Sequence, residues 1–262
     1  MPELPDLEIY KDNLYARLTC KRLAAVQVFA PQKVHAAQET LAQALVDETL
    51  AGIARNGKEL FFRFTGDKTL SVHLMLNGTI AVTQDARDLE RIPGKILALS
   101  FAQETLVFSD VGGLCNIHYP ARVSTVPDAL SDAFTPAYWM TVARKHASAN
   151  IKAFLIDQKV VRGIGNAYAD EILWHARIAP QSIVGKIPQE AMARLHEDIG
   201  AVLLDAIESI RCIAPDIITG EVRSFLQVHN PSLRKTATGA PIRVAQVAQK
   251  TTYFTDEQAR YV

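Results

Sequence analysis

Apolar residues recur at helical spacing near the start of the chain and in short runs thereafter. Leu7, Tyr10, Leu14 and Leu18 follow Pro5 along one face, which predicts an amphipathic helix over residues 5–18. From about residue 22 to 118 the runs are short and are separated by turn signals such as Asn77-Gly78. The predicted strands are residues 22–29, 59–64, 69–75, 79–83, 95–101 and 105–109. This succession predicts a β-sandwich or barrel-like unit.

The apolar spacing changes from strand-like to helical after a stretch that contains three prolines. Residues 120–135 are the predicted linker, with Pro120, Pro127 and Pro136 in or beside it. Helices are predicted over residues 151–158, 166–176 and 188–210, and short strands over 240–244 and 251–255. The fold class is therefore predicted as α+β. The predicted domains are residues 1–119, a helix with a β-sandwich, residues 136–222, a helical domain, and residues 223–262, a small β-hairpin unit.

Composition narrows the class of protein without identifying it. Hydrophobic residues make up 48% and charged residues 21% of the chain, as in globular proteins, and no apolar run is long enough for a membrane span. The start lacks a secretion signal. Cys20, Cys115 and Cys212 are far apart, which favours a reducing compartment and argues against a disulfide framework or a cysteine-only metal site. These features exclude the membrane and disulfide-rich secreted classes.

The charge is balanced overall but uneven along the chain. The formal net charge is 0, which by itself argues against nucleic-acid binding. Residues 222–255, however, contain no acidic residue, and they include Arg223, Arg234, Lys235, Arg243 and Lys250. The sequence therefore predicts a local basic surface on a neutral protein.

The first residues, Met1-Pro2-Glu3, offer a candidate nucleophile. A small second residue permits removal of the initiator Met, which would leave the secondary amine of Pro2 at the N-terminus. The pKa of an α-amino group is roughly 7.7–8, so that part of it is an unprotonated nucleophile at neutral pH. Glu3 lies beside it as a group for proton transfer. The alternative interpretation is an ordinary start, with Pro5 opening the helix.

A second candidate site is the Gly163-Ile164-Gly165 turn between two predicted helices. Glycines allow the backbone to approach another molecule closely, and the amides at a helix start suit an anion such as a phosphate. Asn166 can cap the second helix or contact the phosphate. The alternative is a tight helix–helix connection with a structural cap.

Three blocks of sequence together resemble the formamidopyrimidine-DNA glycosylase / endonuclease VIII family. They are the start from Pro2 to Glu8, the segment Asn56-Gly57-Lys58-Glu59-Leu60, and residues 152–171. With Leu4, the N-terminal block resembles the formamidopyrimidine branch more than the endonuclease VIII branch. The resemblance implies that residues 1–119 are the catalytic domain, that residues 136–222 carry a helix–two-turns–helix DNA-binding motif, and that residues 223–262 are a finger.

The resemblance implies base excision repair, in which damaged duplex DNA is bent and the lesion is extruded. Pro2 would attack the deoxyribose C1′ and form a Schiff base, Glu3 would transfer protons, and β,δ-elimination would cut the strand. No cofactor is expected, and the expected state is a monomer, cytoplasmic and nucleoid-associated in a bacterium or nuclear in a eukaryote. One alternative is a damaged-DNA-binding member with weakened catalysis. Another, which the N-terminal block disfavours, is an RNA- or protein-interaction unit.

The resemblance also implies DNA contacts that position the duplex without reading its sequence. Lys58 would contact a phosphate near the lesion, although a solvated hairpin lysine would look the same. His73 and Tyr168 have structural alternatives, at a strand end and on a helix face. The implied DNA-binding residues are His73, Lys152, Asn166, Tyr168, Arg243 and Lys250.

The finger departs from the family pattern because no cysteine follows Cys212. Lys235, Thr238, Thr255 and Gln258 stand roughly where four zinc ligands would be, and tetrahedral zinc needs Cys or His. We therefore expect a zincless finger and no metal. Apolar packing would have to replace the metal, and the candidates are Ile242, Val244 and Phe254.

Two further departures concern the lesion. The wedge that fills the gap left by the flipped base would be Leu76 and Leu114, with Gly112 where an Arg is usual, which puts opposite-base discrimination in doubt. The stretch 211–226 is shorter than the lesion-capping loop of the formamidopyrimidine branch. Oxidised pyrimidines, formamidopyrimidines and hydantoins therefore become as plausible as 8-oxoguanine.

Overall fold

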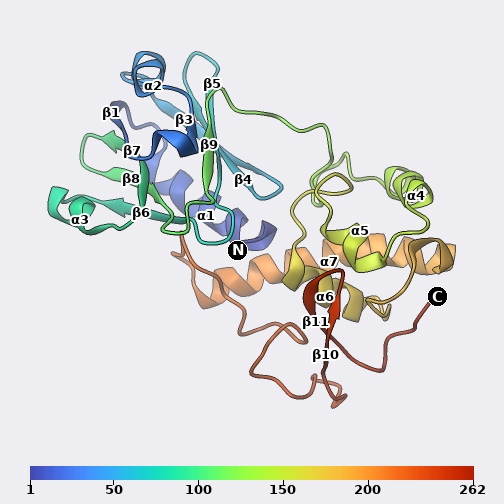
Figure 1. Ribbon diagram of the computed structural model, residues 1–262. Coiled ribbons are helices and arrows are strands. Elements are labelled where there is room, and N and C mark those ends of the chain that lie inside the picture. The colour runs from blue at the N-terminus through green and yellow to red at the C-terminus, as the bar shows by residue number, and fades with distance from the viewer. The chain divides into compact units, whose positions relative to one another are not determined.

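The computed structural model describes residues 1–262 except for the side chain of Ala86. The chain forms two compact units, whose elements are labelled in Figure 1. Unit 1 comprises Met1–Pro2, Asp6–Val123 and Ala214–Glu221, and unit 2 comprises Glu3–Pro5, Ser124–Ile213 and Val222–Val262. Two short segments thus belong to a different unit from their neighbours in sequence. No helix in the described part of the chain is long and apolar enough to cross a membrane.

Unit 1 contains two β-sheets and the helix α1 (Leu4–Leu18), which begins in the segment assigned to unit 2. One sheet has the strand order β1-β7-β8-β6 and the other β2-β9-β5-β4-β3. The strands are β1 (Leu23–Val28), β2 (Val34–His35), β3 (Leu50–Asn56), β4 (Glu59–Phe64), β5 (Lys68–His73), β6 (Thr79–Thr83), β7 (Lys95–Phe101), β8 (Thr105–Ser109) and β9 (Asn116–His118). Shorter connecting elements are η1 (Pro31–Lys33), α2 (Gln38–Leu45) and α3 (Ala86–Arg91).

A single apolar core joins both sheets of unit 1 to α1. Tyr10, Leu14 and Leu18 of α1 are buried in it, as their helical spacing predicts. Phe62 of β4 and Phe108 of β8 come from different sheets and meet edge to face, with ring centroids 5.4 Å apart. The predicted α+β class with an N-terminal helix and a β-sandwich is therefore confirmed.

The strands that sequence analysis missed are those with a weak apolar pattern. β3 has the sequence LAGIARN, in which Leu50 and Ile53 are the buried residues and Gly52 interrupts the run. β2 and β9 have two and three residues, which is too short for alternation to appear. By contrast, β4, β6, β7 and β8 have the predicted bounds.

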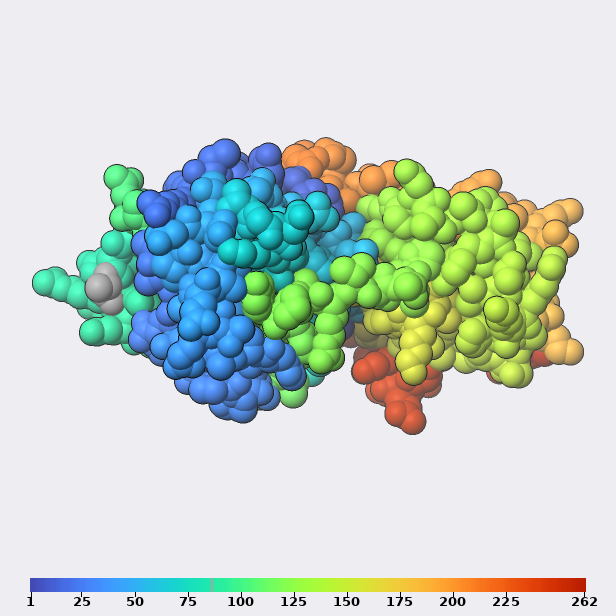
Figure 2. Space-filling model, turned by 90° about the horizontal axis from the view of Figure 1, so that it is seen from above, coloured from blue at the N-terminus to red at the C-terminus, as the bar shows by residue number. Residues whose placement is uncertain are grey.

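Unit 2 is built around the long helix α7 (Gln189–Ile213), which buries Leu195, Ile199, Leu203 and Ile210. The indole nitrogen of Trp139, a fully buried residue of α4, donates to the Met192 carbonyl at 2.9 Å and so joins α4 to α7. Figure 2 shows α4 and its surroundings at the surface of this unit. The other elements are α4 (Pro136–Lys145), α5 (Ile151–Ile156), α6 (Asn166–His175), η2 (Val184–Lys186), β10 (Arg243–Val247) and β11 (Lys250–Phe254).

The hairpin of β10 and β11 is displaced from the predicted position of its first strand. β10 begins at Arg243, three residues after the predicted start at 240. Ala248 and Gln249 form a two-residue turn with φ of 51° and 60°, which pairs Val247 with Lys250. Because neither residue is a Gly, Asn or Asp, the sequence carried no turn signal there and the prediction was wrong at this end.

Candidate functional site

Glu3 occupies the start of α6 within unit 2. Its carboxylate accepts hydrogen bonds from the backbone amides of Gly165 at 2.7 Å, Ala167 at 3.0 Å and Tyr168 at 3.4 Å. The positive end of a helix and its unpaired amides stabilise such an anion. The amides that sequence analysis assigned to a phosphate are therefore bonded to a carboxylate of the chain itself. They hold Glu3 in one orientation directly after Pro2, which is buried in unit 1.

The turn before α6 approaches the N-terminal segment closely. Leu4 donates its amide to the Gly163 carbonyl at 3.2 Å. Gly163 has a φ of 108°, and a Cβ there would lie 2.5 Å from Cδ1 of Leu4. The side chain of Gln158 bonds to both sides of the turn, accepting from the amide of Gly163 at 3.0 Å and donating to the Ile164 carbonyl at 2.8 Å. Glycine is required here so that Glu3 can reach the helix start.

Lys152 lies at the centre of a buried polar network in unit 2. Its amine is 2.7 Å from Oδ1 of Asp170, and both side chains are 0% exposed. It also donates to the Thr252 hydroxyl at 2.6 Å. Burial lowers the pKa of Lys152, and the charges of Asp170 and Glu3 act against that shift. Lys152 therefore ties α5 to α6 and to β11, and its contact with a DNA phosphate stays a prediction.

Asp170 connects this network to the segment that leads into the finger. Its Oδ2 lies 2.7 Å from Nδ1 of His229 and accepts from the amide of Tyr253 at 2.9 Å. Sequence analysis did not single out Asp170, because an acidic residue on a helix is usually solvated. Its partners are 18 or more positions away along the chain, so no local pattern revealed them.

Two other residues of α6 hold the segment after Val222. Glu171 accepts hydrogen bonds from the amides of Gln227, Val228 and His229 at 2.7–2.9 Å. Burial raises the pKa of this carboxyl, while the three amides oppose the rise. The buried ring of Tyr168 lies 5.2 Å from the guanidinium of Arg223. α6 is thus a scaffold for the start of the finger segment.

Asn166, the first residue of α6, also contacts the finger. Its side-chain amide donates to the Thr251 carbonyl at 3.0 Å, and it makes no capping bond to the helix, for which Gly165 is the N-cap. Arg243 is exposed and bonded to Asp256 at 2.8 Å, and Lys250 is exposed at the first position of β11. The DNA contacts of Asn166, Tyr168, Arg243 and Lys250 stay predictions.

Hydrogen bonds hold Thr238, Thr255 and Gln258, which stand at expected zinc positions of the finger. Thr238 donates to Glu257 at 3.0 Å. The amide of Thr255 donates to Oε1 of Gln258 at 2.8 Å, and the side chain of Gln258 donates to the Ile178 carbonyl at 2.8 Å. Hydroxyls and amides do not fit the thiolate and imidazole preference of structural zinc. Among the described residues, no group of three or more His, Cys, Asp or Glu side chains could hold a metal ion.

The prediction that apolar packing replaces the metal in the finger was partly wrong. Val244 is 59% exposed, whereas Val247 is buried, and Ile242 and Phe254 are half-buried. Thr252 and Thr255 are also buried. Polar contacts to α6 and Ile178 therefore hold the finger, together with a smaller apolar contribution than the sequence suggested.

We expect chelators to leave the finger intact. Incubation with EDTA should not change the thermal unfolding midpoint or the affinity for a duplex that contains a stable abasic analogue, because no thiolate or imidazole set binds zinc there. Fluorescence anisotropy and differential scanning fluorimetry measure the two quantities. A loss of affinity that added zinc restores would contradict the hydrogen-bonded finger.

Lys58 lies in the turn between β3 and β4 of unit 1, as the family resemblance implied, and it is 6% exposed, unlike a solvated hairpin lysine. Gly57 precedes it with a φ of 61°. Arg55 supports the turn, with one nitrogen donating to the Gly57 carbonyl at 3.2 Å and another to Glu8 at 2.6 Å. On the same sheet, His73 ends β5, and its Nδ1 accepts from the Met75 amide at 3.0 Å. These bonds thus set the positions of Lys58 and His73, whose phosphate contacts stay predictions.

The two predicted wedge loops of unit 1 touch each other. Leu76 is 56% and Leu114 42% exposed. A Cβ on Gly112 would lie 2.9 Å from the side-chain nitrogen of Asn77, so a side chain at that position would displace the end of Asn77. Beside the loops is a hollow of about 720 Å³, lined by Asn77, Gly112 and Thr219 among others.

Asp110 shapes the second of these loops. Its carboxylate accepts from the amides of Gly112, Leu114 and Cys115, each at 2.7 Å. Burial alone would raise the pKa of Asp110, but the amides outweigh it and the pKa is lowered. The loop therefore presents Leu114 from a fixed backbone.

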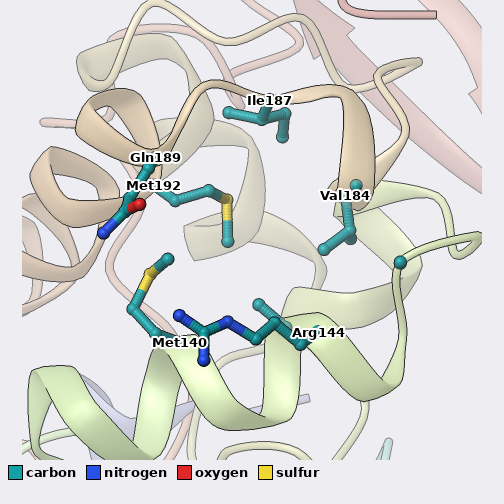
Figure 3. A pocket seen from close by; sticks show the side chains of 9 residues that line it. Met140, Arg144, Val184, Ile187, Gln189 and Met192 are labelled. Atoms are coloured by element: carbon teal, nitrogen blue, oxygen red, sulfur yellow. The ribbon is translucent and has the colours of Figure 1, made fainter.

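A pocket of about 270 Å³ lies elsewhere in unit 2, between α4, η2 and the start of α7 (Figure 3). Met140, Val184, Ile187 and Met192 make it apolar, and Arg144 supplies its positive charge. None of the predicted catalytic or DNA-binding residues lines it. The residues that line it include neither a nucleophile nor a carboxylate, so it is a surface hollow between packed helices.

Comparisons with known proteins identify the same family that the three sequence blocks resemble. Residues 1–115 match the family model of the formamidopyrimidine-DNA glycosylase N-terminal domain, and residues 126–214 match that of the formamidopyrimidine-DNA glycosylase H2TH domain. The chain is 28% identical over 268 residues to a formamidopyrimidine-DNA glycosylase of Lactococcus lactis, with 97% of each chain covered. It is 32% identical over 271 residues to that of Symbiobacterium thermophilum, covering 97% of this chain and 88% of that protein.

Solved structures resemble the whole chain. A complex between the Lactococcus lactis enzyme and DNA with an abasic site has a TM-score of 0.87 at 28% identity, covering 99% of this chain and 100% of that one. A complex of the same bacterium's enzyme with DNA containing an oxidised pyrimidine has a TM-score of 0.85 at 28% identity, covering 97% and 98%. Both neighbours bind damaged DNA.

Proposed function

Since the chain belongs to the formamidopyrimidine-DNA glycosylase family and is a DNA glycosylase of base excision repair, we propose that it is also an abasic-site lyase that acts through Pro2. The observation that supports this most directly is the fixed carboxylate of Glu3. Three amides at the start of α6, including that of its N-cap Gly165, orient it, and it follows the candidate nucleophile without an intervening residue. A proton-transfer group is effective only when it is held in position.

The chemistry requires the amine that remains when Met1 is removed. The nitrogen lone pair of Pro2 bonds to C1′ of the deoxyribose, and the bond from C1′ to the base breaks, with its electron pair leaving on the base. The nitrogen of Pro2, now an ammonium, loses its proton to a base. Glu3, once it has taken up a proton from solvent, donates it to O4′ as the ring opens, and the nitrogen lone pair forms an iminium between Pro2 and C1′. Loss of the C2′ proton then allows β-elimination of the 3′ phosphate, and δ-elimination follows. Lys58 is proposed to hold a phosphate near the lesion.

Oxidised bases are the proposed substrates. Support comes from the neighbour that binds DNA with an oxidised pyrimidine. The stretch 211–226 is short, and the wedge loops carry the aliphatic side chains of Leu76 and Leu114, which offer no hydrogen bond to the unpaired base. We therefore propose weak discrimination between opposite bases and a spectrum that includes oxidised pyrimidines, formamidopyrimidines and hydantoins.

The alternative, a damaged-DNA-binding member with weakened catalysis, rests on the altered wedge and the short segment alone. Pro2, Glu3 and Lys58 are all present, and Glu3 has three hydrogen bonds that orient it. These bonds would also stabilise the start of α6 in a binding module, but only an enzyme needs the oriented carboxylate together with Pro2 and Lys58. We favour the enzyme for this reason.

Borohydride trapping tests the proposal. Protein whose intact mass confirms a Pro2 terminus is incubated with a duplex that contains an abasic site, and borohydride reduces any iminium to a stable amine. A covalent complex is expected within the first turnover. The same protein is then assayed on duplexes with 8-oxoguanine, a formamidopyrimidine, thymine glycol and a hydantoin. Binding without any trapped complex would support the binding module instead.

A further inference from the structure

The segment Ala214–Glu221 is fixed to unit 1 as a strap. The side chain of Asn13 in α1 donates to the carbonyls of Pro215 at 2.7 Å and Ile217 at 2.9 Å. Ile217 and Ile218 pack against the apolar core. The hydroxyl of Tyr10 donates to the Gly220 carbonyl. The bonds of Asn13, the apolar packing of the two isoleucines and the bond of Tyr10 thus hold the strap in place as far as Gly220.

The last residue of the strap, Glu221, meets the start of the chain. Its carboxylate forms an ion pair with the α-amine of Met1, and the side chains of Glu221 and Met1 are 33% and 28% exposed. Met1–Pro2 and the strap both belong to unit 1, so the contact is internal to one compact body. The strap therefore holds a negative charge at the N-terminal amine.

We propose that Glu221 is the carboxylate partner of the nucleophilic amine of Pro2, an inference that rests on the proposed lyase function. Removal of Met1 moves the terminal nitrogen by one residue, or at most about 3.6 Å, and rotation of the Glu221 side chain covers part of that distance. The strap itself is held independently of this ion pair. The carboxylate consequently remains near the new amine.

A secondary amine needs such a partner more than a primary amine does. When Pro2 attacks C1′, its nitrogen becomes positively charged and must lose its proton before the iminium can form. Glu221 accepts that proton and later releases it to solvent. The iminium of a secondary amine has no N–H to lose, so it keeps its positive charge until the strand is cut. A nearby carboxylate stabilises that charge.

A purely structural role of Glu221 predicts a different effect of its substitution. A partly exposed ion pair contributes about 0–1 kcal/mol, and the strap has its other contacts. Substitution of Glu221 would then leave the rate of iminium formation unchanged. The two roles therefore predict different rates of iminium formation for Glu221→Gln, but the same fold and the same affinity for DNA.

The test uses Glu221→Gln, Glu221→Asp and the control Asp216→Asn in the full chain with a confirmed Pro2 terminus. Asp216 lies exposed on the same strap, so the control removes the same charge from the same segment. The single-turnover rate of borohydride trapping on an abasic duplex is measured alongside the affinity for a tetrahydrofuran duplex. We expect Glu221→Gln to slow trapping by roughly 10-fold to 100-fold and to leave the affinity unchanged. This effect lies at or below the roughly 10²-fold to 10⁴-fold that general acid–base groups contribute to a rate. Glu221→Asp should recover part of the rate, and Asp216→Asn should match the wild type.

Three outcomes overturn the inference. If Glu221→Gln traps as fast as a reactive wild type, the carboxylate is not a partner of the amine, and the proposed function stands. If Glu221→Gln loses affinity and thermal stability in parallel with rate, the slower trapping comes from a disturbed strap and not from the loss of a proton acceptor. If the wild type itself forms no complex, the lyase proposal fails and this inference fails with it.

Discussion

A version of the protein that keeps a residue ahead of Pro2 is expected to lose borohydride trapping on abasic DNA by roughly 10³-fold or more, as enzymes do when a nucleophile is removed. With Met1 in place, the nitrogen of Pro2 is part of a peptide bond, and its lone pair is delocalised into the carbonyl. It cannot attack C1′. The measurement is single-turnover trapping with two preparations, processed and unprocessed, whose termini are established by intact mass.

The control for this prediction is binding without chemistry. Both preparations should bind a tetrahydrofuran duplex with equal affinity, because Glu3 keeps its bonds to α6 in the structure that includes Met1. Equal trapping by both preparations would mean that another amine is the nucleophile. Lys58 is the first to examine, since the family resemblance places it near the lesion.

Sequence analysis predicted features that depend on local pattern. The face of α1 and the strands β4, β6, β7 and β8 follow from spacing and turn residues within a few positions, whereas the hairpin at Lys58 came from the family resemblance. The class of fold followed from these elements. The blocks at Pro2, Lys58 and residues 152–171 gave the family because they occur together in one order.

What the sequence did not predict depends on contacts between distant positions. Lys152, Asp170, His229 and Thr252 form one buried network, yet each alone resembles a solvated polar residue. The turn at Ala248-Gln249 has positive φ without a glycine, so the register of β10 was misplaced. The bond between Glu3 and α6 spans more than 160 positions. Such pairings are determined by packing, which no local pattern encodes.

The finger illustrates how this network replaces a metal. A zinc ion would fix four ligands of a hairpin to each other. Here β11 is bonded instead to α5 and α6, through Thr252 to Lys152 and through the Tyr253 amide to Asp170. The position of the hairpin thus depends on the buried pair of Lys152 and Asp170. Weakening this pair should affect the finger and the helices together.

Asp170→Ala is therefore expected to destabilise unit 2 by about 3–5 kcal/mol, the cost of removing one partner of a buried ion pair. The substitution leaves the amine of Lys152 buried and unpaired, and it removes the acceptor of His229 and of the Tyr253 amide. Urea unfolding followed by tryptophan fluorescence measures the loss, because both tryptophans of the chain, Trp139 and Trp174, lie in unit 2.

Two further variants separate the buried pair from general effects of losing a charge. Asp198→Ala breaks a partly exposed pair with His175 in the same unit and should cost about 1 kcal/mol or less. Adding Lys152→Met to Asp170→Ala removes the unpaired buried charge, so it should restore part of the lost stability. If the double variant is instead less stable than Asp170→Ala by the full effect of Lys152→Met alone, the two side chains act independently. In that case the hairpin is held by its remaining bonds, those of Asn166 to Thr251 and of Gln258 to Ile178, rather than by the ion pair.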